Sequence, residues 1–120
     1  MHEGDISRDA RTWGMICHLS LFAGYVVPCA GLLAPLVIWM MKKEESAYID
    51  YHGREALNFI ISIFCVGLVN GLLCLTGVWL ILGIPIAIAL AIVGVVMPII
   101  AAIKANDGEH YRYPYIFRLL

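Results

Sequence analysis

Two side chains that could perform acid–base or metal chemistry stand three residues apart in the segment YIDYHGREALNFIIS, residues 48–62. His52 and Glu55 would share one face of a helix, as catalytic and metal-binding pairs often do. A catalytic metal would need a third ligand, for which His18 is the first candidate and Asp50 a second. The competing interpretation is that these polar residues satisfy one another where the chain enters the lipid. Because one such pair is weak evidence for chemistry, we favour this second interpretation. We therefore predict no catalytic residue, metal or cofactor.

Asn58 follows Glu55 by one helical turn, and Ser62 follows on the same side. An amide in the hydrocarbon region needs a partner on a neighbouring helix, so this side should face the interior of a helix bundle. His18 lies within an apolar segment, where an ionisable group is by default a functional hypothesis. A neutral histidine bonded to a carbonyl, to Asn58 or to Glu55 would explain it equally well. The candidate polar or partner-docking residues are therefore His18, His52, Glu55 and Asn58.

Small residues form a second pattern, because they let helix backbones approach closely in a membrane. Gly67 and Gly71 make a GxxxG motif, and the following apolar stretch carries a matching stripe of Ala87, Ala91 and Gly94. We predict that these residues pack two helices together within one chain. Homo-oligomerisation is compatible with the pattern but is not required by it.

Several classes of function lack their usual sequence features. The chain has no glycine-rich phosphate loop, no HExxH and no GxSxG. Its four cysteines lie in apolar segments without CxxC spacing, which is typical of small buried hydrophobes. A net charge of −1 provides no broad basic surface for nucleic acid.

The elements that must position these residues belong to a membrane protein. Of the 120 residues, 62% are hydrophobic and only 14% are charged. No Asp, Glu, Lys or Arg occurs from residue 56 to residue 103, although one crossing needs only about 20 apolar residues. This run is predicted to cross the bilayer twice, as a helical hairpin.

The first apolar block, residues 12–41, allows two topologies. A single helix of this length would extend about 45 Å, too long for a hydrocarbon core of about 30 Å unless strongly tilted. The segment GYVVPCAG, residues 24–31, favours a break near residues 25–28, which would make a short or partly re-entrant hairpin. The hairpin also places all eight Lys and Arg residues on one side, whereas one kinked span would separate two of them from the rest.

The predicted fold is therefore an all-α, multi-pass protein of the bacterial inner (cytoplasmic) membrane, with two helical hairpins, about four membrane segments and an interfacial carboxyl-terminal tail. Residues 1–120 form one membrane domain, and both termini are expected to be cytoplasmic. Its parts are the amino terminus (1–11), the first apolar block (12–41), a polar loop (42–55), the second hairpin (56–103) and the tail (104–120). In the tail, aromatic residues alternate with other types from Tyr111 to Arg118, which favours an extended segment whose aromatic side rests on an apolar surface.

The segment CHLSLFAGYVVPCAGLLAPLVIWMMKKEESAYIDYHGREALNFIIS, followed by YRYPYIF, resembles a widespread family of small bacterial membrane proteins of unknown function. That family is distantly similar to Tic-twenty, a component of the chloroplast inner-envelope translocon. The resemblance covers residues 13–118 and implies a helical membrane domain of about four segments. It implies no catalytic residues.

Three classes of function remain open. A small non-enzymatic membrane protein that binds other membrane proteins or itself ranks first, with the lipid bilayer as its surroundings. A subunit of a transport or protein-translocation channel ranks second, and it would need several copies because the chain is too small to enclose a pore alone. An intramembrane metal-dependent enzyme ranks last.

Overall fold

The protein is an all-helical bundle, in which the described residues contain no strand. The computed structural model describes residues 7–27, 29–114 and 116. Its helices are α1 (Arg8–Leu19), the short 3-10 helix η2 (Ser20–Tyr25), α2 (Ala30–Lys42), α3 (Ala47–Cys74) and α4 (Leu80–Asn106). The all-helical class predicted from the sequence is confirmed.

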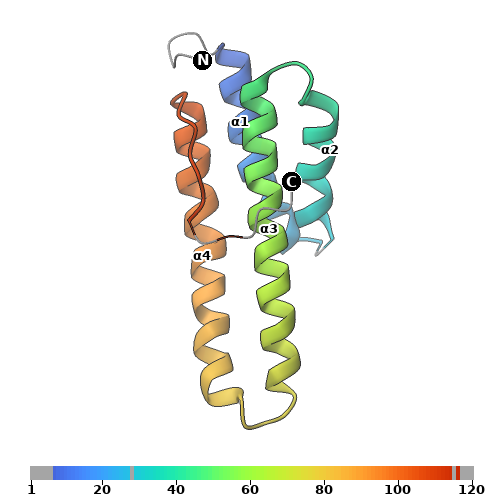
Figure 1. Cartoon of the computed structure of the whole chain (residues 1–120), viewed down its shortest axis with the longest axis vertical. Helices are drawn as coiled ribbons and strands as arrows, with labels where there is room; N and C mark the ends of the chain where they lie inside the picture. Colours follow the sequence, from blue (N-terminus) through green and yellow to red (C-terminus); the bar gives the residue numbers. More distant parts are fainter. Residues whose placement is uncertain (1–6, 28, 115, 117–120) are drawn as a thin grey trace.

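The bundle has two unlike ends (Figure 1), and its extents are 53 × 24 × 22 Å. At the four-helix end, α1 and α2 run antiparallel beside the first half of α3 and the second half of α4. At the two-helix end, only α3 and α4 continue, and they join through the turn at residues 75–79. The chain reverses direction between Tyr25 and Ala30, so residues 12–41 fold back on themselves.

Local signals explain where the helices begin and end. The Ser46 side chain accepts a hydrogen bond from the Tyr48 amide and caps α3, as Ser7 caps α1 through the Ala10 amide. Gly77 in the α3–α4 turn and Gly108 after α4 have positive φ angles of 79° and 87°, a conformation that other residues rarely adopt. With the Ser46 cap, α3 begins at Ala47, so residues 47–55 of the segment assigned to the polar loop belong to the helix.

The reversal between η2 and α2 depends on two facing glycines. A Cβ atom on Gly24 would lie 3.0 Å from the Gly31 Cα atom, and the reverse substitution would be equally tight. Their lack of side chains lets η2 and the start of α2 touch backbone to backbone. The α1–η2–α2 unit therefore closes as a tight hairpin.

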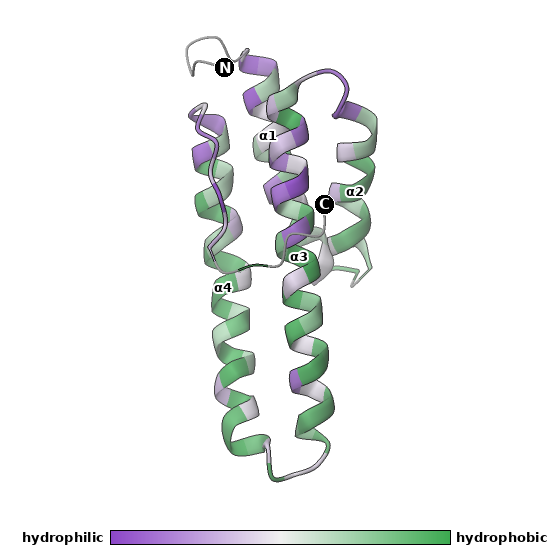
Figure 2. Cartoon of the chain, in the orientation of Figure 1, coloured by the Kyte–Doolittle hydropathy of each residue, from purple (hydrophilic) through white to green (hydrophobic). Residues whose placement is uncertain are grey.

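Among the described residues, only α3 and α4 are long and apolar enough to cross a membrane. The helix α1 has 12 residues and α2 has 13, which is short of a crossing. The structure thus supports two membrane-crossing helices rather than four segments, because the reversal divides the first apolar block into short arms. Figure 2 shows the charged and polar residues gathered at the four-helix end, while the two-helix end is almost wholly apolar.

The core lies at the four-helix end, where α1, α3, α4 and the tail meet. Its buried hydrophobic members come from α1, η2, α3, α4 and the tail, and they include Cys17, Leu21, Tyr48, Ile49, Ala56, Phe59, Ala101 and Tyr113. Large apolar side chains at the two-helix end are instead exposed, among them Leu68, Leu75, Val78 and Ile81. This end needs an apolar surrounding, which a lipid bilayer supplies.

Candidate functional site

A chain of hydrogen bonds crosses the core of the four-helix end. The Tyr113 hydroxyl lies 2.7 Å from His18 Nδ1, and His18 Nε2 lies 2.8 Å from His52 Nδ1. His52 Nε2 lies 2.9 Å from the main-chain carbonyl oxygen of Glu109. We call these four groups the histidine relay. It joins α1, α3 and the tail, which are 34 to 95 residues apart in the sequence.

The last acceptor fixes the direction of the relay. A carbonyl oxygen only accepts, so His52 Nε2 carries a hydrogen and, in a neutral ring, Nδ1 accepts. His18 therefore donates from Nε2 and accepts at Nδ1, which leaves the Tyr113 hydroxyl as the first donor. Every group is satisfied only in this order, with both imidazole rings neutral.

Burial maintains these protonation states. His18 is fully buried, and burial is the main cause that holds its pKa well below the ordinary value. The neighbouring His52 ring is the second cause. Burial is also the main cause that raises the pKa of Tyr113 well above its ordinary value, and the neighbouring Tyr111 is the second. The Tyr113 hydroxyl thus stays protonated as a donor, and His18 stays neutral as an acceptor.

Further hydrogen bonds fasten the tail beside the relay. A Glu55 carboxylate oxygen accepts from the Tyr113 amide at 2.9 Å. The Tyr48 hydroxyl shares its one hydrogen between the carbonyl oxygens of Ala105 and Glu109, at 2.7 and 2.8 Å. The Tyr51 hydroxyl likewise shares its hydrogen between the carbonyl oxygens of His110 and Tyr111, at 3.1 and 3.0 Å. The first turns of α3 therefore present a row of side chains to the backbone of the tail.

The structure brings three of the four candidate polar residues to one place. His18, His52 and Glu55 meet around the tail, and all three are buried. Asn58 lies one turn deeper on α3 and is 2% exposed, with its carbonyl oxygen accepting from the Ser62 hydroxyl at 2.8 Å.

Sequence reasoning missed Tyr113 and the Glu109 carbonyl as members of the site. The alternating aromatic residues of the tail were the available signal, and they predicted an apolar contact. That contact exists, since the Tyr113 ring stacks on Phe59 with centroids 4.3 Å apart.

The relay engages all four ring nitrogens of its two histidines. Its ring nitrogens are each within hydrogen-bond distance of a protein partner, and both imidazole rings are 0% exposed. A proton path would also end at a main-chain carbonyl, which cannot pass a proton on. Among the described residues, no group of three or more His, Cys, Asp or Glu side chains is arranged to hold a metal ion. The arrangement is suited to holding the tail on the bundle.

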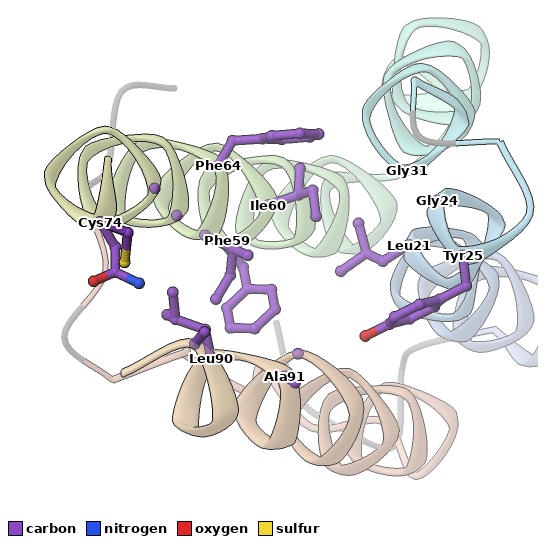
Figure 3. A pocket seen from close by; sticks show the side chains of 16 residues that line it. Leu21, Gly24, Tyr25, Gly31, Phe59, Ile60, Phe64, Cys74, Leu90 and Ala91 are labelled. Atoms are coloured by element: carbon purple, nitrogen blue, oxygen red, sulfur yellow. The ribbon is translucent and has the colours of Figure 1, made fainter. Parts of the chain in front are cut away.

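The small residues line a cavity of about 530 Å³ between α3 and α4, instead of packing the two helices together. Figure 3 shows this cavity, with Phe59, Leu90 and the Tyr25 hydroxyl directed into it. A Cβ atom on Gly67 or Gly71 would meet no atom within 4 Å. The close contact predicted for these two glycines is therefore not formed. The predicted stripe of Ala87, Ala91 and Gly94 lines the opposite wall.

Comparison with known proteins identifies a family. The sequence model of the MamF/MmsF family, described as the magnetosome magnetite crystal formation protein family, matches residues 9–120. No curated protein and no solved structure matches the chain, and none of the comparisons shows the resemblance to Tic-twenty.

Proposed function

Because the chain belongs to the magnetosome magnetite crystal formation protein family, we propose that it is a non-enzymatic protein of the membrane in which such crystals form. In this proposal it acts by assembling with other membrane proteins, or with copies of itself, at its exposed apolar surface. The observation that carries the proposal is the division of the molecule into a closed polar end and an apolar two-helix end. The family's role in crystal formation is a membrane-associated one.

The proposed topology follows from charge. In it, α3 and α4 cross the bilayer, and the α1–η2–α2 hairpin enters from the four-helix end without crossing. Exposed Val26 and Val27 at the tip of this hairpin support its partial insertion. All the described Lys and Arg residues belong to the four-helix end, because residues 56–103 contain none. Basic residues near span ends stay cytoplasmic, so both termini and the loop at residues 43–46 would be cytoplasmic.

The non-enzymatic part of the proposal depends on the histidine relay. A general acid or base must reach its substrate within hydrogen-bond distance, directly or through one water. His18 and His52 are fully buried, and their ring nitrogens already have protein partners. No observation favours the translocation-channel alternative over assembly.

Complementation tests the proposal. The chain would be expressed in a magnetite-forming bacterium that lacks its own members of the family, and crystal sizes would be measured by electron microscopy. We expect the chain to restore the size distribution and to crosslink to membrane proteins in the same cells. Unchanged crystals, together with no crosslinked partner or self-oligomer, would refute the proposal.

A matched variant separates assembly from enzymatic action. His18→Gln keeps an amide donor and acceptor in the relay but removes the imidazole. If the variant folds and assembles normally, crystal formation should be unaffected. Loss of crystals with intact assembly would instead indicate that the imidazole has a role beyond assembly.

A further inference from the structure

The tail from Glu109 to Tyr113 is held on the bundle mainly by side chains, beside one main-chain hydrogen bond from the Glu109 amide to the Lys104 carbonyl oxygen at 3.0 Å. Glu109 is held through its carbonyl by His52 and Tyr48, and Tyr113 is held at its amide by Glu55 and at its hydroxyl by His18. The two ends of this segment thus depend on the relay. A change in the relay therefore acts directly on the attachment of the tail.

Protonation is such a change. A proton added to His18 makes its Nδ1 atom a donor. A proton added to His52 reverses the His18–His52 hydrogen bond and moves the hydrogen of His18 to Nδ1. In either case the Tyr113 hydroxyl must accept instead of donate. It also places a positive charge between two fully buried rings, which is costly. A second proton sets His18 Nε2–H against His52 Nδ1–H across 2.8 Å. When the tail detaches, His18 and His52 lose their Tyr113 and Glu109 partners and water can reach the rings, so a charge on either ring costs less.

We propose that the segment Glu109–Tyr113 is an acid-released latch, closed by two neutral histidines and opened when they take up protons. Titratable and charged groups of the described residues face this segment and the two rings from every element packed against them. They come from α1, α3, α4 and the tail: Arg11, Cys17, Tyr48, Tyr51, Glu55, Lys104, Glu109, His110, Tyr111 and Tyr113. The Glu55 carboxylate binds the Tyr113 amide, and Glu109 pairs with Lys104 at 3.6 Å.

The size of the effect follows from proton uptake. An exposed histidine has an ordinary pKa of about 6.5. Below that pH, each proton taken up on opening raises the open-to-closed ratio about tenfold per pH unit. Two histidines would raise the ratio up to about a hundredfold per unit. Opening uncovers His52 and Glu55 at the polar end of the bundle, where a water-borne partner could reach them.

Hydrogen–deuterium exchange of the full chain in lipid nanodiscs tests the latch. Exchange of the peptide covering residues 107–114 would be followed by mass spectrometry from pH 7.5 to pH 4.5, with each rate divided by the intrinsic rate at that pH. We expect the corrected rate to rise at least tenfold per pH unit somewhere below pH 6.5. A corrected rate that does not change with pH would overturn the proposal.

Variants assign the rise to the relay. The double variant His18→Gln/His52→Gln retains amide donors and acceptors that do not titrate, so its corrected rate should be flat. His110→Gln is the matched control, because this exposed ring has no side-chain hydrogen bond among the described contacts, and it should keep the full rise. Glu55→Gln should keep it too. A rise that persists in the double variant would show that other groups open the tail.

A direct measurement covers the case in which the double variant does not fold. Nitrogen-15 spectra of the unaltered chain report which ring nitrogen carries the hydrogen. Above pH 7, we expect Nε2–H and bare Nδ1 on both His18 and His52. Any other tautomer pair would contradict the relay and, with it, the latch.

Discussion

Tyr113→Phe isolates one hydrogen bond of the relay with little change in packing. The hydroxyl is the first donor of the relay, and its loss leaves His18 Nδ1 without that donor. The Phe ring can keep the stacking of Tyr113 on Phe59, where the centroids are 4.3 Å apart. The variant therefore reports the hydroxyl rather than the aromatic ring.

The expected loss in the free energy of unfolding is about 1–3 kcal/mol, the cost of a buried acceptor left without its partner. The relay cannot compensate by reversing. A reversed His52 would direct a bare Nε2 at the Glu109 carbonyl oxygen 2.9 Å away, so two acceptors would face each other. His18 and Tyr113 are 0% and 1% exposed, so water has little access to the vacant position.

Reversible unfolding in mixed micelles, followed by far-ultraviolet circular dichroism at pH 7.5, measures this loss. Tyr51→Phe is the control, because its hydroxyl donates to carbonyls of the more exposed His110 and Tyr111, which water can reach. We expect it to cost no more than about 0.5 kcal/mol, as an exposed position usually does. A Tyr113→Phe loss equal to or below that of the control would refute the assigned direction of the relay.

Other predictions use the same unfolding assay or a reporter. Gly53→Ala should lower the free energy of unfolding by about 1–3 kcal/mol, because its Cβ would overlap the Trp39 ring. Gly67→Ala meets open space and should raise the free energy of unfolding by up to about 1 kcal/mol. The opposite order of stabilities would contradict the packing. Asn70→Leu should cost about 1–3 kcal/mol, since its amide bonds the Gly83 carbonyl and the Trp79 indole, and an unchanged midpoint would show that water replaces these bonds. A reporter active only in the cytoplasm should give signal at both termini, and signal at one terminus alone would exclude the proposed topology.

The sequence predicted the parts of the fold that depend on composition. The stretch from residue 56 to residue 103 contains no charged residue, and it lies within α3 and α4, the two helices able to cross a membrane. The number of membrane segments was not predictable in the same way. Residues 12–41 are apolar enough for a crossing, but the facing glycines Gly24 and Gly31 fold them into two short arms.

Periodicity could not distinguish a contact from a cavity. Gly67 and Gly71 have the spacing of a close helix contact, yet that spacing says nothing about the bulk of the residues at the same level. Phe59 and Leu90 enter the space between the helices. Whether a small residue forms a close contact therefore depends also on the side chains of the neighbouring helix.

The role of the polar residues was the hardest to predict, because it depends on a contact across 95 residues. A histidine pair with a tyrosine and a glutamate is also the composition of many catalytic sites. What decides between catalysis and attachment is whether a ring nitrogen is left for a substrate. In this chain the tail supplies both ends of the relay, through the Tyr113 hydroxyl and the Glu109 carbonyl. Residue types that could act on a substrate thus hold a segment of the same chain, and under the proposed latch the release of the tail would make them available to another molecule.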